Sequence, residues 1–219
     1  MDLMAIRRSL MIGQKPTGRL PRGFREVEWL RSTGEQWIDT GILSKPNQRF
    51  VIKIRINDLT HNNGNCSIIG GWDANYFAQI VANGNADGWI VQWANVFMQV
   101  GQKNTEINVF DCDLVRKTIK INGISYALTA PITSSSTNQS MYLFAANNNG
   151  TVIRRTKADL FFGEIYNDDI LSRNFVTCYR ESDNEPGLYD LCGSICPLTN
   201  SPFYVNAGTG EFLVGPEVN

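Results

Sequence analysis

The stretch FVIKIRI (residues 50–56) has an apolar residue at every second position, from Phe50 to Ile56. Its three isoleucines fall on one face of an extended chain, and the opposite face carries Val51, Lys53 and Arg55. A period of two is typical of an antiparallel strand that has one buried and one solvated face. The stretch therefore predicts a sheet that covers a core on one side only.

Further strands are predicted on both sides of this stretch. In KTIKINGISYAL (residues 117–128), Asn122 and Gly123 provide the positive φ angles that a tight type I′ hairpin turn requires. Other short strands are predicted in EQWIDTGI, CSIIGGW, YFAQIVANG, GWIVQW, MYLFAA and KADLFFGEIY, and Asn- and Gly-rich loops separate them. Because no long amphipathic helix is evident, the pattern favours an all-β sandwich or barrel.

Length and composition fit an ordinary globular protein. The 219 residues are 42% hydrophobic and 19% charged, with a formal net charge of −1, which suits one domain over residues 21–219 preceded by an arm over residues 1–20. A balanced charge excludes the concentrated basic face of a nucleic-acid-binding protein. No apolar run of about 18 residues predicts a membrane span, and the first residues lack the pattern of a secretory signal.

The arm mixes apolar and basic residues before Pro16 and Gly18 interrupt it. Two interpretations stay open: a frayed terminus, or a segment that docks on a partner subunit, because exposed Met and Leu side chains are costly unless covered. The candidate docking residues are Met4, Ile6, Arg7, Arg8, Leu10 and Met11.

Cysteine and histidine patterns argue against a metal or a cofactor. Five irregularly spaced cysteines indicate mostly reduced, buried thiols, although a local disulfide between Cys192 and Cys196 stays open. Zinc requires four ligands, and His61 is the only histidine in the chain. The glycine-rich NAGTGEF lacks the Lys-Ser/Thr of a phosphate loop. Calcium stays unassigned, because no spacing singles out the loop residues Asp73, Asp87 and Asp183.

Catalytic patterns are scarce. His61 lies in LTHNNGN, which reads as an exposed loop with no neighbouring group to orient the ring. Asp111 and Asp113 share one strand face by spacing, but equally suit a solvated turn, and the Glu-x-Asp-x-x-Glu pattern of β-sandwich glucanases is absent. We therefore expect no enzymatic activity.

Aromatic residues gather between positions 72 and 97, with Asn, Asp and Gln side chains among them. Such a segment suits sugar binding, since aromatic faces stack on sugar rings and polar edges bind hydroxyl groups. The alternative is a sandwich core, because Trp89, Val91 and Trp93 lie on the same face of one predicted strand. The candidate glycan-binding residues are Trp72, Asp73, Asn75, Tyr76, Trp89, Gln92 and Trp93.

Both ends of the predicted domain carry a specific resemblance. GFREVEWLRSTGEQWIDTGI (residues 23–42) and the closing GLYD and FYVNAGTGEF motifs (187–190 and 203–212) resemble the two ends of a concanavalin A-like lectin/laminin-G-like jelly-roll family. Here Trp29 and Trp37 stand where that family has Tyr. In the middle of the chain, only the regular spacing of the predicted strands matches that family. Members occur in bacteriophage structural proteins and gut-bacterial surface proteins, and their end motifs are structural, so no catalytic residue carries over.

The resemblance implies a concanavalin A-like jelly-roll β-sandwich in which the first and last strands pair and remove two sheet edges. Trp37 is then expected near Phe203 and Tyr204, with the insert CGSICPLTNSP (residues 192–202) decorating this seam.

The expected function is that of a bacteriophage virion structural or adhesion protein: a head decoration, fibre or tail-associated component. Its arm would hold a lectin-like domain to other virion proteins or sister subunits as a homo-oligomer, with host-surface glycan as a further partner. The alternative is a carbohydrate-binding module of a bacterial surface protein, and a glycoside hydrolase is the least favoured. The expected location is the virion, or alternatively the bacterial cell surface, without membrane insertion.

Overall fold

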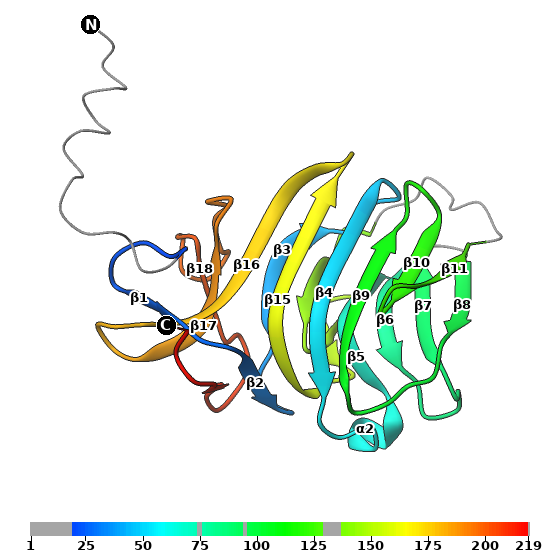
Figure 1. Cartoon of the computed structure of the whole chain (residues 1–219), viewed down its shortest axis with the longest axis horizontal. Coiled ribbons are helices and arrows are strands. Elements are labelled where there is room, and N and C mark those ends of the chain that lie inside the picture. Colours follow the sequence, from blue (N-terminus) through cyan, green and yellow to red (C-terminus); the bar gives the residue numbers. More distant parts are fainter. Residues whose placement is uncertain (1–18, 74–75, 94–95, 129–136, 219) are drawn as a thin grey trace, which may run out of the picture.

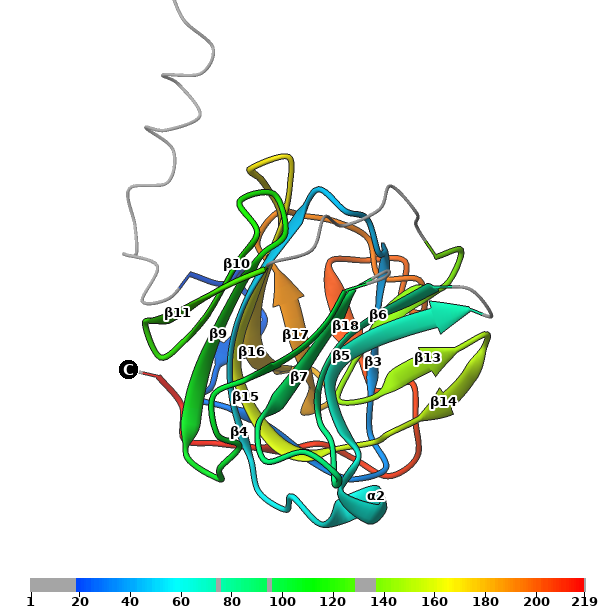
Figure 2. The same cartoon turned by 90° about the vertical axis from the view of Figure 1, so that its right-hand side faces the viewer.

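The computed structural model describes residues 19–73, 76–93, 96–128 and 137–218. In these residues the chain is all-β, as predicted, and builds two antiparallel sheets that face each other (Figures 1 and 2). One strand pair, β13 with β5, is parallel. The described residues include no helix long and apolar enough to cross a membrane.

The large sheet has eleven strands. Its main path runs in the order β11 (Ile124–Ala127), β10 (Thr118–Ile121), β9 (Ile107–Asp113), β4 (Gln48–Ile56), β15 (Lys157–Asn167), β16 (Ile170–Arg180), β17 (Glu185–Asp190) and β18 (Phe203–Val205). Off this path, β1 (Phe24–Glu26) pairs with β16, and β2 (Leu30–Thr33) pairs with both β15 and β19 (Leu213–Val214).

The small sheet has eight strands. Its main path is β14 (Thr151–Ile153), β13 (Ala146–Asn148), β5 (Cys66–Asp73), β6 (Tyr76–Ala82), β7 (Trp89–Trp93) and β8 (Val96–Val100). Off this path, β12 (Ser140–Leu143) pairs with both β3 (Ile38–Leu43) and β5. A single short helical turn, α2 (His61–Gly64), connects β4 to β5.

The two strongest strand predictions are confirmed. Along β4 buried residues alternate with partly exposed ones, and the isoleucines of FVIKIRI all point into the core. In the β10–β11 hairpin, Asn122 and Gly123 have φ angles of 51° and 83°. Both positive values match the turn whose twist suits an antiparallel hairpin.

Large aromatic side chains fill the space between the sheets. The ring of Phe50 on β4 lies 4.8 Å from that of Trp93 on β7, measured between centroids. Trp89 on β7 meets Phe110 on β9 edge to face, with centroids 5.0 Å apart. Each pair joins one strand of the large sheet to one of the small sheet, so these rings stabilise the stacking of the two layers.

The two ends of the domain close against each other, as the sequence predicts. Strand β19 pairs antiparallel with β2, and Val27 forms an isolated bridge with Glu217. Two residues after β18, the backbone N–H of Ala207 donates to the carbonyl of Trp37 at 2.9 Å. The last strand of the domain therefore lies beside its first strands, and we call this closure the seam.

Candidate functional site

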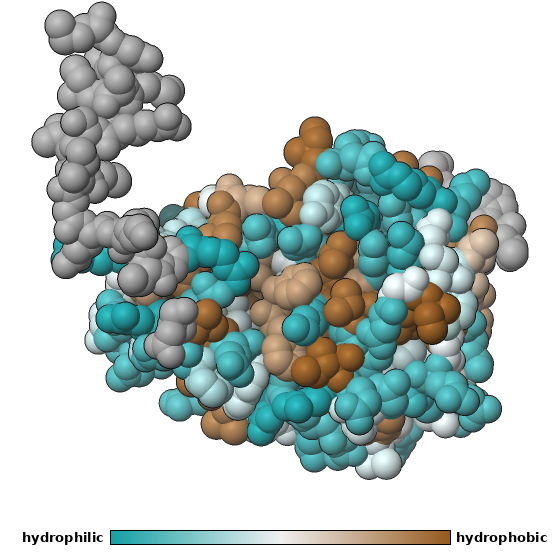
Figure 3. Space-filling model, in the orientation of Figure 1, coloured by the Kyte–Doolittle hydropathy of each residue, from teal (hydrophilic) through white to brown (hydrophobic). Residues whose placement is uncertain are grey.

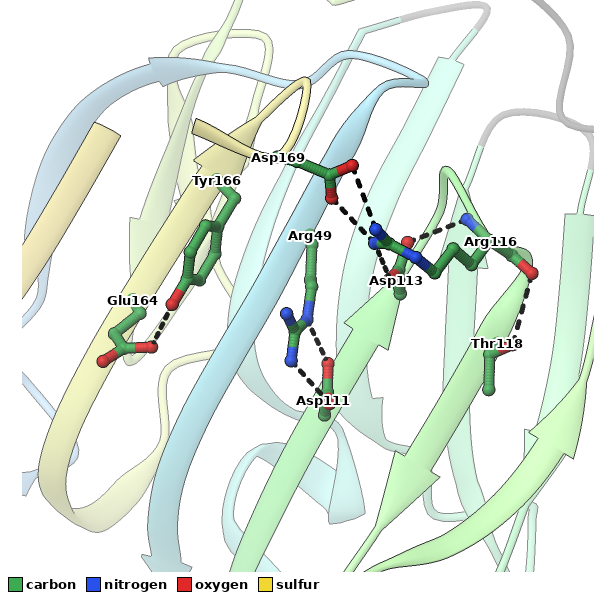
Figure 4. Close-up of polar contacts among 8 residues, drawn as sticks. All are labelled: Arg49, Asp111, Asp113, Arg116, Thr118, Glu164, Tyr166 and Asp169. Atoms are coloured by element: carbon green, nitrogen blue, oxygen red, sulfur yellow. Dashed lines mark hydrogen bonds and ion pairs between the residues drawn. The ribbon is translucent and has the colours of Figure 1, made fainter. Parts of the chain in front are cut away.

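The outer face of the large sheet carries a shallow polar hollow with a volume of about 510 Å³. Strands β4, β9, β10 and β15 form its floor, and the turns after β9 and β15 form its upper rim (Figure 4). Its lining contains three carboxylates, three cations, a hydroxyl group and a phenol. These residues are Arg49, Asp111, Asp113, Arg116, Thr118, Lys120, Tyr166 and Asp169.

Strand periodicity brings these side chains to one face. Asp111 and Asp113 are two residues apart on β9, so both face away from the core, whereas Cys112 between them is fully buried. The antiparallel register places Arg49 of β4 opposite Asp113, and Lys120 of β10 opposite Asp111. Cross-strand neighbours of opposite charge stabilise such a sheet face.

Arg49 forms the centre of the floor. Its Nε and Nη2 donate to the two carboxylate oxygens of Asp111 at 2.7 and 2.9 Å, which raises the pKa of the guanidinium. The guanidinium also lies 5.3 Å from the centroid of the Tyr166 ring. The hydroxyl of Tyr166 donates to Glu164 at 2.7 Å, and this bond raises the pKa of the phenol. These contacts fix the tyrosine ring at the side of the hollow.

Arg116 joins the two turns at the rim. Its Nη1 donates to Asp113 at 2.8 Å, and its two terminal nitrogens donate to Asp169 at 2.7 and 3.0 Å. Burial favours a higher pKa for Asp113, but the backbone N–H and the guanidinium of Arg116 outweigh it, so that this pKa is lowered. The turns that follow β9 and β15 are therefore held together by one side chain.

This charge arrangement suits binding better than acid catalysis. Each of the three lining carboxylates accepts hydrogen bonds from an arginine, and a general acid needs a carboxyl group whose pKa is raised. The pKa of Asp113 is instead lowered. An open face of fixed donors and acceptors beside one aromatic ring can hold a polar ligand in a defined orientation.

The structure corrects the sugar-platform interpretation for the three tryptophans. Trp89 and Trp93 are 0% and 1% exposed and pack in the core, which confirms the alternative drawn from their shared strand face. Trp72 is 6% exposed, because the guanidinium of Arg154 lies 4.9 Å over its ring and Phe77 packs beside it. None of these rings offers a free face for a sugar.

The polar members of that predicted set lie apart from the hollow. Gln92, which is partly exposed, accepts a hydrogen bond from buried Gln79 at 2.9 Å on the outer face of the small sheet. Asp73 is partly exposed at the end of β5. Asn75 lies outside the described residues, and only the backbone of Tyr76 is described, at the start of β6.

The remaining sequence candidates have separate places. His61 lies in α2 rather than in an extended loop, and its Nε2 is buried without a hydrogen-bond partner. Cys192 and Cys196 are free thiols, the first exposed and the second buried. The carboxylate oxygens of Asp183 accept hydrogen bonds from Arg180 at 2.6 and 2.9 Å, and in the described residues no group of three His, Cys, Asp or Glu side chains could hold a metal ion. The docking residues proposed in the arm, from Met4 to Met11, lie outside the described residues.

Sequence reasoning placed Asp111 and Asp113 on one strand face, weighed them only as a catalytic pair or a solvated turn, and missed the rest of the hollow. Arg49 immediately precedes the FVIKIRI stretch. Extending the alternation by one residue would have placed it on the same outer face as Val51, Lys53 and Arg55. Tyr166 and Asp169 come from the β15–β16 hairpin, whose position beside β4 becomes visible only in the folded sheet.

A scan of known protein-family models finds none that matches this chain, and the search of curated proteins likewise finds no match.

Proposed function

We propose that this chain is a non-enzymatic structural or adhesion protein of a bacteriophage particle, whose jelly-roll domain binds glycan in the hollow. The resemblance of both chain ends to a jelly-roll family of phage and bacterial surface proteins supports the setting. The proposed fold is the concanavalin A-like one, and residues 1–20 are the arm that attaches the domain to the particle.

One observation carries the binding role: the hollow is open, and both of its arginines are already paired with carboxylates. The guanidiniums of Arg49 and Arg116 each donate at least two hydrogen bonds to carboxylates, so the polar surface is fixed before any ligand arrives. A preorganised surface loses less conformational entropy on binding. Arg49 lies over one face of the Tyr166 ring, but the ring is partly exposed, unlike that of Trp72, and adds an aromatic surface against which a sugar ring stacks.

Weak sugar contacts suit a displayed, multivalent protein. A shallow hollow gives low affinity for a single saccharide, but many copies on one particle raise the effective affinity without any new contact. This supports a particle component over an isolated soluble lectin.

Glycan binding is tested with the purified chain on a glycan array, followed by titration calorimetry with the best ligand. We expect Tyr166→Ala to weaken binding by about tenfold, through loss of about 1.4 kcal/mol of ring contact. The control is Arg25→Ala on β1. It removes an exposed ion pair between Arg25 and Glu181, and we expect it to leave the affinity unchanged. Binding that is unaffected by Tyr166→Ala contradicts the assignment of the hollow.

The particle role is tested separately. Residues 1–18 are deleted, and incorporation of the protein into assembled phage particles is measured by electron microscopy. Loss of incorporation with glycan binding intact supports the arm as the attachment. Glycan binding by a chain that never joins particles favours the alternative of a bacterial surface lectin, and steady turnover of a polysaccharide overturns the non-enzymatic assignment.

A further inference from the structure

Strand β8, at the end of the small sheet, lacks the features that usually protect a sheet edge. Within the described part of the chain it pairs with β7 alone. Edge strands are normally kept from pairing with other chains by short length, charged side chains, prolines or bulges. The sequence of β8, VFMQV, has five residues without a charge or a proline, and its pairing with β7 runs without a register shift.

The edges at the other end of the sandwich are shorter. Strands β14 and β18 have three residues each, which limits the ladder that a second chain could add. The β8 end lies far from the described start of the chain, on the right of Figure 1, whereas β1 lies on the left. Nothing at the seam therefore obstructs a partner that approaches β8.

Apolar side chains are exposed at this same end. Phe97 on β8 is 64% exposed, and Ile124 on the neighbouring edge strand β11 is 63% exposed. The two edges are adjacent, because the hydroxyl of Tyr126 on β11 approaches Gly101, directly after β8, to within 3.2 Å of where a Cβ would stand. Phe97 thus exposes an apolar ring on the unpaired edge strand itself, where a partner strand would cover it.

We propose that β8 pairs with β8 of a second copy of this chain, antiparallel and about a twofold axis at Met98. This register places Met98 opposite itself, Val96 opposite Val100 and Phe97 opposite Gln99. Paired residues are then both odd-numbered or both even-numbered, and alternate residues of a strand point their backbone N–H and C=O groups to the same edge. The groups that point away from β7 in one copy therefore face those that point away from β7 in the other.

The side chains favour a second copy as the occupant. Val96, Met98 and Val100 face inward, and the twofold register sets each of them against an apolar residue of the partner, which continues the core across the junction. No charge lies on either strand, so two copies meet without like-charge repulsion. A twofold contact also closes on itself and gives a dimer rather than a fibre.

The test is the oligomeric state of the full chain, measured by sedimentation equilibrium. We expect the wild-type protein to be a dimer at micromolar concentration. The double variant Phe97→Lys with Gln99→Lys sets lysine against lysine twice across the axis, and we expect it to weaken the dimer by more than about 100-fold. Phe97→Lys with Gln99→Glu sets lysine against glutamate instead and restores the dimer.

Two further variants separate this contact from other surfaces. Ile170→Lys changes a residue that is 71% exposed on the β15–β16 hairpin and leaves the dimer intact. We expect deletion of residues 1–18 also to leave the dimer intact. If the shortened chain were monomeric, self-association would belong to the arm, and the proposal would be overturned. A monomeric wild-type chain, or a dimer unaffected by the two lysines, overturns it as well. None of these results depends on glycan binding or particle attachment.

Discussion

Asp159 is a fully buried carboxylate that two arginines share on neighbouring strands. Arg31 of β2 and Arg55 of β4 lie directly opposite it on either side, and the amide of Asn57 donates to it at 2.8 Å. Three donors satisfy a charge that burial alone would destabilise. This cluster ties β2, β15 and β4 together next to the seam.

Asp159→Asn removes the charge and keeps the shape of the side chain. We expect the free energy of unfolding at pH 7 to fall by about 3 kcal/mol, because Arg31 and Arg55 lose their shared counter-ion. Urea unfolding followed by circular dichroism measures the change. Asp183→Asn, which breaks the solvent-exposed pair with Arg180, is the control and leaves the midpoint nearly unchanged.

The same residue makes stability depend on pH. Burial favours a higher pKa for Asp159, but the hydrogen bonds from Arg31, Arg55 and Asn57 outweigh it and lower the pKa below its ordinary value. A lowered folded-state pKa contributes stability that is present above the unfolded value of about 3.9 and is lost as the pH falls. We therefore expect wild type and Asp159→Asn to differ by a constant amount from pH 5 to 8, and the gap to narrow as the pH falls below 4. A gap that does not narrow below pH 4 would contradict this.

Individual residues of the hollow show where sequence reasoning ends. Spacing alone places Asp111 and Asp113 on one face, and the structure agrees. Their partners depend on the register between strands and on contacts between distant turns, since Arg116 and Asp169 are 53 positions apart. Alternation likewise places Trp89 and Trp93 on a common face, but only the second sheet decides that this face points inward.

At the scale of elements, the seam depends on a close approach of two loops. A Cβ on Gly208 would lie 2.1 Å from the carbonyl oxygen of Glu35 and 2.9 Å from the ring of Trp37. Neither neighbour is the free end of a flexible side chain. Only glycine allows the GTG segment (208–210) to lie against the loop before β3.

Gly208→Ala is expected to lower the free energy of unfolding by about 1–3 kcal/mol, because backbone or ring must move to admit the methyl group. Gly163→Ala is the matched control. Its Cβ would meet Phe175 at an ordinary 3.7 Å, so we expect a change below about 1 kcal/mol. Thermal and urea unfolding of both variants measure the difference, and equal effects at the two sites would argue against a tight seam.

For the whole molecule, strand alternation predicted the all-β class, and the end motifs predicted that the first and last strands pair. In the structure the last strand, β19, pairs with β2, whereas the first strand, β1, pairs with β16. The order of strands within each sheet was out of reach, because β4 lies between β9 and β15, which are far from it in sequence. Many alternating strands satisfy the same apolar pattern equally well. Long-range pairing therefore has to be read from the folded chain.

Deletion of residues 213–219 tests the seam at this scale. It removes β19 and the bridge from Val27 to Glu217, and it leaves one side of β2 without its partner. We expect the melting temperature to fall by about 5–10 °C, with a greater tendency to aggregate through the bare edge. Differential scanning calorimetry and light scattering provide the measurement. Unchanged melting would show that the closing strand adds nothing to stability.

The seam also has a consequence for biosynthesis. The ribosome makes a protein from its N-terminus, so β2 leaves the exit tunnel well before its partner strand β19. Until β19 emerges, each nascent chain exposes an incomplete sheet. Folding would therefore depend on how well this unpaired edge is kept from aggregating until β19 arrives.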